Sequence, residues 1–366
     1  MPAATRKPRA AKATNAAIAK FEERFAKSMG TEVQRNTKTV YDVIPTGSLE
    51  LDAALGIGGW PCGRISEVWG PEHAGKTTAA YWAVANAQEK FPDKMCAWVD
   101  MEQTFDSSWA EKNGVDLARL WVYHPEDAEG VADAVKQFVA SDLCSLVVLD
   151  SVGGMIARSE IEKDADEATV GLVAKTVTRM VKLCAPACYR NGTAILVINQ
   201  VRANIGKYGP DEDTGGGWAL KHVTTIKVQV RRGEPIQARI LGELLTIGHK
   251  VAARIQKNKA AVNGGKVEFA LISRTTDVYP YVGVDQVQEA FDVAKKYGVL
   301  PRGGWVTFSD GERIQGKDKA VAHLRQNPNL VQELREKVLA SLGDMVIEPD
   351  AIDEIADLAS EMEEGT

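Results

Sequence analysis

A glycine-rich segment around residue 70 has the residue types and spacing of a phosphate-binding loop. Its residues in order are Gly70, Pro71, Glu72, His73, Ala74, Gly75, Lys76, Thr77 and Thr78. They fit the pattern G-x-x-x-x-G-K-[ST], in which backbone amides curl around bound phosphates. Lys76 supplies positive charge to the outer phosphates, and Thr77 offers a hydroxyl to Mg²⁺. Because an apolar run precedes the loop and a helical pattern follows from Thr78 to Lys90, the segment predicts a nucleotide-binding site.

An acidic residue ends another apolar run and is the partner that such a loop requires. Asp150 directly follows Leu146–Leu149. A carboxylate at the end of a buried strand can enter the Mg²⁺ shell beside the phosphates. For an isolated aspartate a simple strand-end turn would be the alternative, and the upstream loop favours the magnesium role. Thr77 and Asp150 are therefore the predicted metal ligands.

Hydrolysis of a nucleotide also needs a group that orients or deprotonates the attacking water. A carboxylate at the carboxyl end of a neighbouring strand has a suitable location in sheets of this kind. The run Ala97–Val99 is followed by Asp100 and, two residues later, by Glu102. Spacing alone does not choose between these two acids.

The elements that would position these residues form a repeating pattern from Arg64 to about Val230. Short apolar runs alternate there with helical patterns; the runs are Ile65–Trp69, Cys96–Val99, Leu146–Leu149, Ala194–Ile198 and Thr225–Val230. Such alternation predicts an α/β fold with a mainly parallel twisted sheet and helices on its faces. Beyond about residue 270 the pattern changes to helices, a glycine-rich turn and a short strand near Trp305, which predicts a small α+β domain.

The two ends of the chain carry opposite charge. Residues 1–14 contain four basic residues and no acid, whereas residues 343–366 contain nine acids and no Lys or Arg. Between the basic tail and the core, Ile18, Phe21 and Phe25 lie at helical spacing within 16–27. We therefore expect a basic tail and an amphipathic helix (1–35), a core (36–270), a small C-terminal domain (271–342) and an acidic tail (343–366).

The composition is that of a globular protein. The chain has 366 residues, 45% hydrophobic and 26% charged, with a formal net charge of -6. No apolar run approaches the roughly 18 residues that cross a bilayer, so we expect a cytoplasmic protein without membrane partners. The negative total does not exclude an anionic partner, because a binding surface is local and the tail alone contributes nine negative charges.

Many short segments, in one order, resemble the RecA family of bacterial and phage recombinases. The segments are Ile44–Leu49, Leu51–Asp52, Ala54–Gly56, Gly70–Thr78, Val99–Glu102, Leu149–Val152, Ile198–Arg202, Gly216–Lys221 and Lys257–Lys259. The resemblance extends over nearly the whole chain. It implies a RecA-like ATPase core that uses ATP and Mg²⁺, a helical homo-oligomeric filament on single-stranded DNA, and homologous pairing and strand exchange with double-stranded DNA.

The resemblance also implies roles for single residues. Glu102 falls on the catalytic glutamate, with Lys76 as the second catalytic group, whereas Asp100 is structural or adjacent to Mg²⁺. Gln200 falls on the residue that senses the γ-phosphate and signals to the DNA loops. Asp106 and Trp109 fall where the family contacts adenine; the family has Tyr at the second position, so the π-face is kept and the hydroxyl lost. The remaining implied nucleotide contacts, which reach a neighbouring subunit's ATP, are Lys257 and Lys259.

Two DNA-binding loops are implied, at about 162–171 and 202–217. The implied DNA contacts are Val170, Lys175, Arg202, Lys207, Tyr208, Gly216 and Gly217. Without the resemblance these segments would be interpreted as ordinary solvated loops. The first loop is unusually acidic over Lys163–Glu167, and Val170 stands where the family often has Met. These departures are typical of a diverged member.

Two other functions are compatible with parts of the pattern. One is a RecA-like ATPase that remodels DNA without forming a recombinase filament, and the other is a non-enzymatic protein with an inactive ATPase fold. The helix with Phe21 and Phe25 favours a filament over the first. The intact Lys76, Glu102 and Asp150 favour an enzyme over the second.

Overall fold

The computed structural model describes residues 9–29, 41–161, 171–203, 212–214, 217–240, 242–261, 265–277 and 279–344. The chain divides into two units, residues 1–40 and residues 41–366. In the first unit, α1 (Arg9–Met29) is a single helix that contains the segment 16–27 with helical spacing. The boundary expected at residue 35 stays a prediction. The rings of Phe21 and Phe25 lie 5.9 Å apart on α1. Both rings belong to the apolar stripe expected from the spacing.

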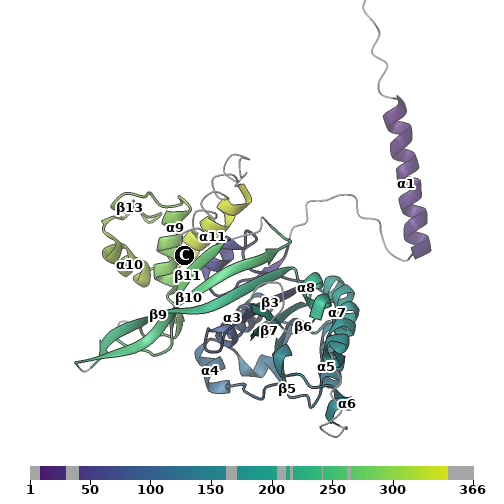
Figure 1. The fold of residues 1–366 in the computed structure, drawn as a ribbon. Helices are drawn as coiled ribbons and strands as arrows, with labels where there is room; N and C mark the ends of the chain where they lie inside the picture. The colour runs from purple at the N-terminus through teal and green to yellow at the C-terminus, as the bar shows by residue number, and fades with distance from the viewer. Residues whose placement is uncertain are drawn as a thin grey trace, which may run out of the picture. The chain divides into compact units, whose positions relative to one another are not determined.

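The second unit contains the remaining helices and strands. In chain order they are β1 (Val43–Ile44), α2 (Leu49–Ala54), β2 (Trp60–Pro61), β3 (Ile65–Gly70), α3 (Lys76–Lys90), β4 (Met95–Asp100), α4 (Ser107–Lys112), η1 (Leu117–Arg119), β5 (Leu120–Tyr123), α5 (Ala128–Ala140), β6 (Cys144–Asp150), η2 (Val152–Gly154), α6 (Arg158–Ile161), α7 (Leu172–Asn191), β7 (Ala194–Ala203), β8 (Glu212–Thr214), α8 (Gly217–Val223), β9 (Ile226–Ile240), β10 (Glu243–Asn258), β11 (Lys266–Ile272), β12 (Gly283–Val284), α9 (Gln286–Lys296), β13 (Trp305–Thr307), β14 (Arg313–Gln315), α10 (Lys317–Gln326) and α11 (Pro328–Asp344). Figure 1 labels most of them.

One large sheet organises the second unit. Its strands lie in the order β12-β11-β10-β9-β3-β7-β6-β4-β5, and β8 pairs with β7. The six strands from β9 to β5 pair in parallel, which confirms the predicted mainly parallel sheet. On the other side of β9, the strands β10, β11 and β12 continue the sheet in antiparallel pairing. The sequence pattern did not predict this extension.

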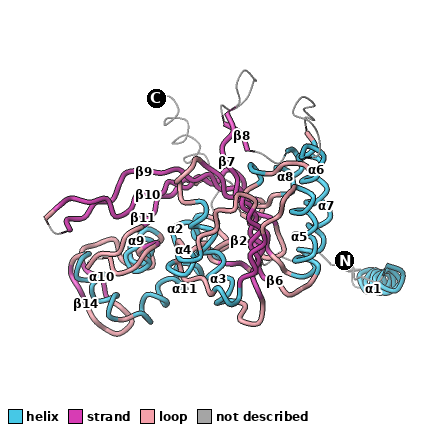
Figure 2. Tube along the Cα trace, turned by 90° about the horizontal axis from the view of Figure 1, so that it is seen from below, coloured by secondary structure: helices cyan, strands magenta, loops and turns pink. Residues whose placement is uncertain are grey.

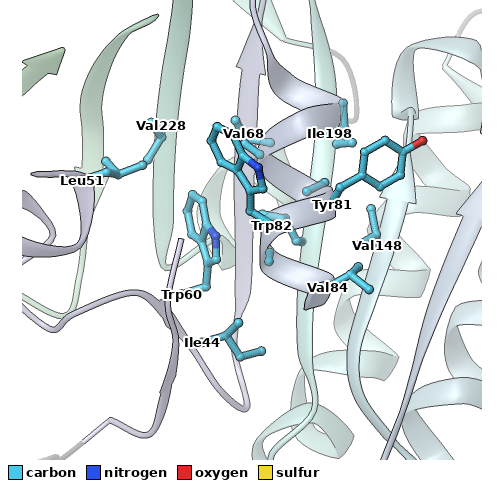
Figure 3. Close-up of a cluster of buried hydrophobic side chains, with 14 of the residues drawn as sticks. Ile44, Leu51, Trp60, Val68, Tyr81, Trp82, Val84, Val148, Ile198 and Val228 are labelled. Carbon is cyan, nitrogen blue, oxygen red and sulfur yellow. The ribbon is translucent and has the colours of Figure 1, made fainter. Parts of the chain in front are cut away.

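Helices cover both faces of the parallel strands (Figure 2). On one face, Tyr81 and Trp82 of α3 pack with Val68, Val148 and Ile198 of the sheet in one hydrophobic cluster (Figure 3). On the other face, α5 and α7 pack their valines against β4, β6 and β7 in a second cluster. Burying an aliphatic or aromatic side chain of this size contributes roughly 1.5–3 kcal/mol. The sheet is therefore held rigidly between two apolar layers.

The strand predicted at Thr225–Val230 is ten residues longer at its carboxyl end than the sequence suggested. β9 continues to Ile240 and pairs with β10 over most of that length, and the two form a hairpin that extends from the sheet (Figure 1). From Arg231 onward most of its residues are exposed or only partly buried. Because pairing with β10 satisfies the backbone hydrogen bonds, this part needs no apolar alternation. Because this apolar alternation is absent, the sequence pattern ended the predicted strand at Val230.

A third hydrophobic cluster joins the C-terminal elements to α2. Residues of α9, α10, α11 and β13 pack with Leu49 and Ala53 of α2. At the same contact, the Ser48 hydroxyl and the Leu49 amide donate to the carboxylate of Glu289, at 2.5 and 2.7 Å. The domain boundaries expected at 270 and 342 stay predictions. The predicted acidic tail lies outside the described residues, apart from its first two.

Asp52 of α2 is fully buried beside this contact. Its Oδ1 accepts a hydrogen bond of 2.7 Å from the Thr46 amide, whereas no described residue donates to Oδ2. Burial raises the pKa of Asp52 to about 7, against the hydrogen bond from Thr46 and the charge of Arg335. Burial likewise raises the pKa of Glu289 to about 7. The folded chain therefore holds protons that the unfolded chain releases above about pH 4.

These groups predict that stability falls as pH rises from about 4 to about 7, since the folded state binds more protons in that window. The wild type should lose unfolding free energy between about pH 5.5 and pH 8. In Asp52→Asn, which keeps an acceptor for Thr46, this loss should be smaller by roughly 1–3 kcal/mol. Urea unfolding at the two pH values measures this. The exposed control Asp93→Asn should behave like the wild type, and an equal pH dependence in all three proteins would contradict the assignment.

Candidate functional site

The phosphate-binding pattern lies between the end of β3 and the start of α3. Gly75 is the N-cap of α3 and adopts a left-handed backbone with φ of 93°, a conformation that glycine reaches without strain. Its position leaves the first turn of α3 without a side-chain cap. The amides of this turn, which starts at Lys76, are consequently available to an anion, and the helix dipole favours negative charge there.

Lys76 points back into its own loop. Its ammonium group donates a hydrogen bond of 2.7 Å to the Pro71 carbonyl, and the residue is buried. Burial lowers the pKa of Lys76, while the negative charges of Asp150, Glu102 and Glu72 oppose that shift. A cation held next to this loop is suited to bind the outer phosphates of a nucleotide.

Asp150 ends β6 directly beside the loop. Its Oδ2 accepts a long hydrogen bond of 3.5 Å from the Thr77 hydroxyl. Burial, followed by the charges of Glu102 and Asp100, raises the pKa of Asp150 to about 7, although Lys76 opposes the shift. Two predicted metal ligands are thus adjacent, and their carboxylate and hydroxyl oxygens are ligands that Mg²⁺ prefers.

The two acids after β4 have different surroundings. The Oε1 of Glu102 accepts hydrogen bonds from the Ser151 hydroxyl and, at 2.8 Å, from the side-chain amide of Gln200. Asp100 is fully buried, and its Oδ2 accepts from the Phe105 amide at 2.9 Å and lies 3.4 Å from Nδ1 of His124. Glu102 thus contacts the predicted sensor, whereas Asp100 holds the chain that follows it.

The predicted adenine contacts lie at the start of α4. The carboxylate of Asp106 caps this helix by accepting a hydrogen bond of 2.9 Å from the Trp109 amide. The indole of Trp109 donates to the Thr78 hydroxyl at 3.3 Å, which connects α4 to the phosphate loop. The Asp106 amide donates to the Tyr81 hydroxyl at 3.2 Å. The indole is therefore held beside the first turn of α3.

Lys257 and Lys259 lie at the end of β10 and just after it. Both ammonium groups donate to backbone carbonyls at the end of α8: Lys257 to Lys221 and, at 3.2 Å, to His222, and Lys259 to His222 at 2.5 Å. Burial and the neighbouring charge of Lys259 lower the pKa of Lys257 to about 8. The structure thus places these two lysines next to each other at the end of α8 and not in the phosphate loop.

Only part of the predicted DNA-binding set can be described. Lys175 is exposed on α7 and lies in one row with Arg179 and Lys182, which are also exposed. Gly217 starts α8 with a φ of 74°. The side chain of Arg202, on β7, is not described. The predicted contacts Val170, Lys207, Tyr208 and Gly216 lie outside the described residues.

The sequence prediction missed several groups that contact the site. Ser151 donates to Glu102. Pro71 was among the predicted loop residues, but its role as the acceptor for Lys76 was not predicted. Glu67 is a buried acid in the middle of β3, where it contacts Asn199 and Lys227. A charged residue within the apolar run Ile65–Trp69 was the available signal for Glu67. The identity of its partners required the fold.

The chain is similar to known proteins over most of its length. Residues 12–276 match the family described as the RecA N-terminal domain. Protein RecA of Acidothermus cellulolyticus is 36% identical over 334 residues, which are 91% of this chain and 93% of that protein. The chain belongs to the RecA family. Protein RecA of Thermus thermophilus is 36% identical over 92% of this chain and 96% of that protein. Protein RecA of Bacteroides thetaiotaomicron is 33% identical over 91% of this chain and 97% of that protein. The resemblance inferred from the motifs is confirmed.

As a RecA-family protein, the chain has a nucleotide-binding ATPase core. The four strands β3, β7, β6 and β4 are neighbours in the sheet, and their carboxyl ends bring Gly70, Gln200, Asp150 and Glu102 to one edge. Within the part of the chain that the structure describes, no helix is long and apolar enough to span a membrane.

Gly70 at the start of the loop has no room for a side chain. A Cβ built on it would contact the Val230 carbonyl oxygen of β9, which is backbone and cannot rotate away. We predict that Gly70→Ala lowers the unfolding free energy by about 1–3 kcal/mol, the usual cost of overpacking, and weakens nucleotide binding because the loop is displaced. Urea unfolding and titration with ATP measure the two effects.

Gly153→Ala is a matched control near the same site, since the closest atom to its Cβ would be Ser151 Oγ at an ordinary 3.5 Å. It should unfold at nearly the wild-type urea concentration. If Gly70→Ala did the same and bound ATP normally, the close approach of Gly70 to β9 would be wrong.

Proposed function

We propose that this chain forms a helical filament on single-stranded DNA, hydrolyses ATP in that filament, and catalyses homologous pairing and strand exchange with double-stranded DNA. RecA-family proteins are DNA-dependent ATPases of recombination and repair, and this chain belongs to that family. The observation that carries the proposal is the match with RecA proteins over more than nine tenths of the chain. Intact phosphate-loop and acidic residues at one sheet edge support catalysis. The proposal includes a cytoplasmic location.

The residues at this edge fit ATP with Mg²⁺. The uncapped first turn of α3 and the Lys76 ammonium suit the phosphates, and Thr77 with Asp150 would hold the metal. Among the described residues there is no cluster of three or more possible metal-binding side chains. Mg²⁺ at nucleotide sites needs only one or two carboxylates, because phosphates and waters complete its shell. When bound, the metal would offset the negative charge that Asp150, Glu102 and the phosphates bring together.

We assign the remaining chemical roles by combining the family resemblance with the contacts. Glu102 would orient and deprotonate the attacking water, and Gln200, which donates to it at 2.8 Å, would sense the γ-phosphate. Trp109 would stack on adenine, with Asp106 beside it. Oδ1 of Asp106 caps α4. The other carboxylate oxygen, Oδ2, is therefore the one available to the adenine base.

DNA binding is assigned to the two loops and to the elements that carry them. Lys175, on the helix that follows the first loop, offers an exposed cation, and Arg179 and Lys182 extend the row. Phosphate contacts of this kind supply sequence-independent affinity. Val170, Arg202, Lys207, Tyr208, Gly216 and Gly217 complete the proposed set.

The phosphate loop provides the direct test of this proposal. We predict that Lys76→Ala folds but loses ATP hydrolysis by about a hundredfold or more, since a charge that complements the phosphates is removed. ATPase rates measured with and without single-stranded DNA report both turnover and DNA dependence. The control Lys90→Ala, at the other end of α3, should keep both. A wild-type protein without DNA-stimulated hydrolysis, or normal turnover in folded Lys76→Ala, would contradict the proposed function.

The two lysines near α8 test whether the ATP site is shared between subunits. If Lys257 and Lys259 complete a neighbour's site, the double alanine variant should bind ATP but show no stimulation by DNA. Mixing it with Lys76→Ala should restore part of the activity, because some interfaces then combine an intact phosphate loop with intact lysines. Titrating one variant into the other and measuring ATPase rates checks this. Full stimulation in the lysine variant alone would rule out the shared site.

A further inference from the structure

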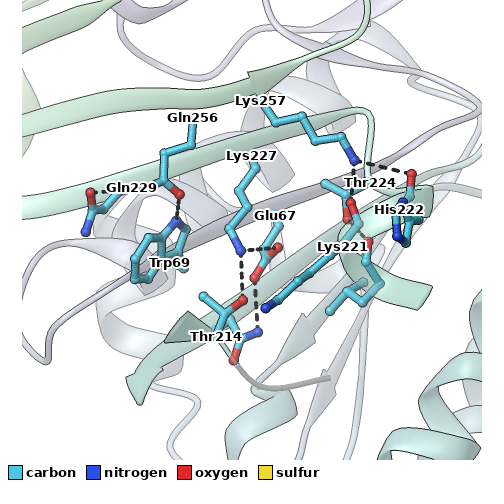
Figure 4. Close-up of polar contacts among 12 residues, drawn as sticks. Glu67, Trp69, Thr214, Lys221, His222, Thr224, Lys227, Gln229, Gln256 and Lys257 are labelled. Atoms are coloured by element: carbon cyan, nitrogen blue, oxygen red, sulfur yellow. Dashed lines mark hydrogen bonds and ion pairs between the residues drawn. The ribbon is translucent and has the colours of Figure 1, made fainter. Parts of the chain in front are cut away.

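A buried ion pair lies across β3 and β9, three residues before the phosphate loop begins. Glu67 of β3 and Lys227 of β9 occupy paired positions of these parallel strands, and Nζ of Lys227 lies 3.2 Å from Oε2 of Glu67. The Glu67 side chain is fully buried and that of Lys227 is 12% exposed. Figure 4 shows the pair between its neighbours. A charge buried in this way persists only when its partner is fixed.

On one side, the pair holds the base of the second DNA-binding loop. The Lys227 ammonium donates a hydrogen bond of 2.7 Å to the Thr214 hydroxyl, and it also lies over the ring of Trp69, 5.1 Å from the ring centre. Thr214 ends β8, which pairs with the end of β7 to form the two arms of that loop. Lys227 therefore ties one arm of the loop to β3.

On the other side, the pair is linked to the proposed nucleotide sensor, Gln200, through Asn199. The amide group of Asn199 donates to Oε1 of Glu67 at 3.0 Å, and its own oxygen accepts from the Gln200 backbone amide at 3.0 Å. Gln200 in turn donates to Glu102 at 2.8 Å. A continuous chain of polar contacts thus runs from the proposed catalytic acid to the loop.

The geometry makes Glu67 and Lys227 dependent on each other. Lys227 has three N–H donors, and a turn of its head toward any other acceptor would leave the buried carboxylate of Glu67 without its cation. Likewise, displacement of Asn199 at the end of β7 removes a donor from Glu67. Neither of the two residues belongs to the phosphate loop or to the set of acids beside it. Their contacts are with the strand that carries the sensor and with the arm of the loop.

We propose that Glu67 and Lys227 are positioning residues that transmit the nucleotide state sensed by Gln200 to the base of the second DNA-binding loop. This inference rests on the proposed function and takes the ATP sensed by Gln200 to favour tight binding to single-stranded DNA. It adds the physical connection between the two sites. Without the pair, each site would still bind its ligand, but the nucleotide would no longer set the affinity for DNA.

The main test removes both charges together, so that no unpaired charge stays buried. The readout is a ratio: the dissociation constant for single-stranded DNA with ADP, divided by that with a non-hydrolysable ATP analogue. In the double variant Glu67→Gln with Lys227→Gln, we expect this ratio to fall about tenfold relative to the wild type, a usual size for coupling between sites. Fluorescence anisotropy of a labelled oligonucleotide measures both constants. A ratio equal to that of the wild type in the folded double variant overturns the inference.

Three single variants separate coupling from stability. Lys227→Arg keeps the charge and should keep the ratio, whereas Thr214→Val keeps the ion pair but removes the acceptor on the loop and should lower the ratio. Thr214→Val also decides the matter if the double variant fails to fold: a wild-type ratio there overturns the inference. Lys250→Gln is the matched control, because among the described residues its ammonium forms exposed ion pairs with Glu234 and Glu268, at 3.5 and 4.0 Å. Its ratio should stay unchanged.

The wild type distinguishes this inference from the function on which it rests. A wild-type ratio near one overturns both, since no nucleotide effect on DNA affinity would exist to be transmitted. A large wild-type ratio that persists in the double variant and in Thr214→Val overturns only the role of Glu67 and Lys227.

Discussion

Repulsion among acids at the carboxyl edge of the parallel sheet is the constraint on which the site depends. Burial, followed by the charges of Glu102 and Asp100, raises the pKa of Asp150, and Lys76 opposes the shift. A nucleotide would bring several more negative charges to the same place. Such a site favours a polyanion only if positive charge comes with it, and Thr77 beside Asp150 offers oxygen ligands for a divalent cation. Loop, acids and metal requirement therefore form one electrostatic unit.

The order of the strands fixes the positions of these groups relative to one another. Gly70 of β3 pairs with Gln200 of β7, and Asp100 of β4 pairs with Asp150 of β6. The phosphate loop, the sensor and the acids consequently follow one another along a single edge of four adjacent strands. Apolar layers on both faces fix these strands, so a change at the edge can be absorbed by side chains and by the loops, not by the sheet.

The sequence allowed the local parts of this arrangement to be predicted, since their signals are local. The phosphate loop, the strand before Asp150 and the parallel sheet follow from short motifs and from alternating patterns. The pairing of Glu67 with Lys227 could not be predicted in the same way, because 160 residues separate them and only the adjacency of β3 and β9 joins them. The antiparallel strands β10 to β12 and the far half of β9 did not follow from the sequence pattern for a related reason: their stability comes from pairing, which leaves little pattern in the sequence.

The short helix α8 connects the features that function would require to move together. It begins at Gly217, where the second loop ends, and its last carbonyls hold Lys257 and Lys259. Seven residues of helix span only about 10 Å, so the loop and the two lysines lie at opposite ends of one rigid element. The carbonyl end of a helix attracts cations, and an anion from a neighbouring subunit would compete for the same ammonium groups. If DNA binds the second loop as proposed, it would act on the same short helix that holds these lysines, so the proposed filament contacts and the proposed DNA binding would share one element.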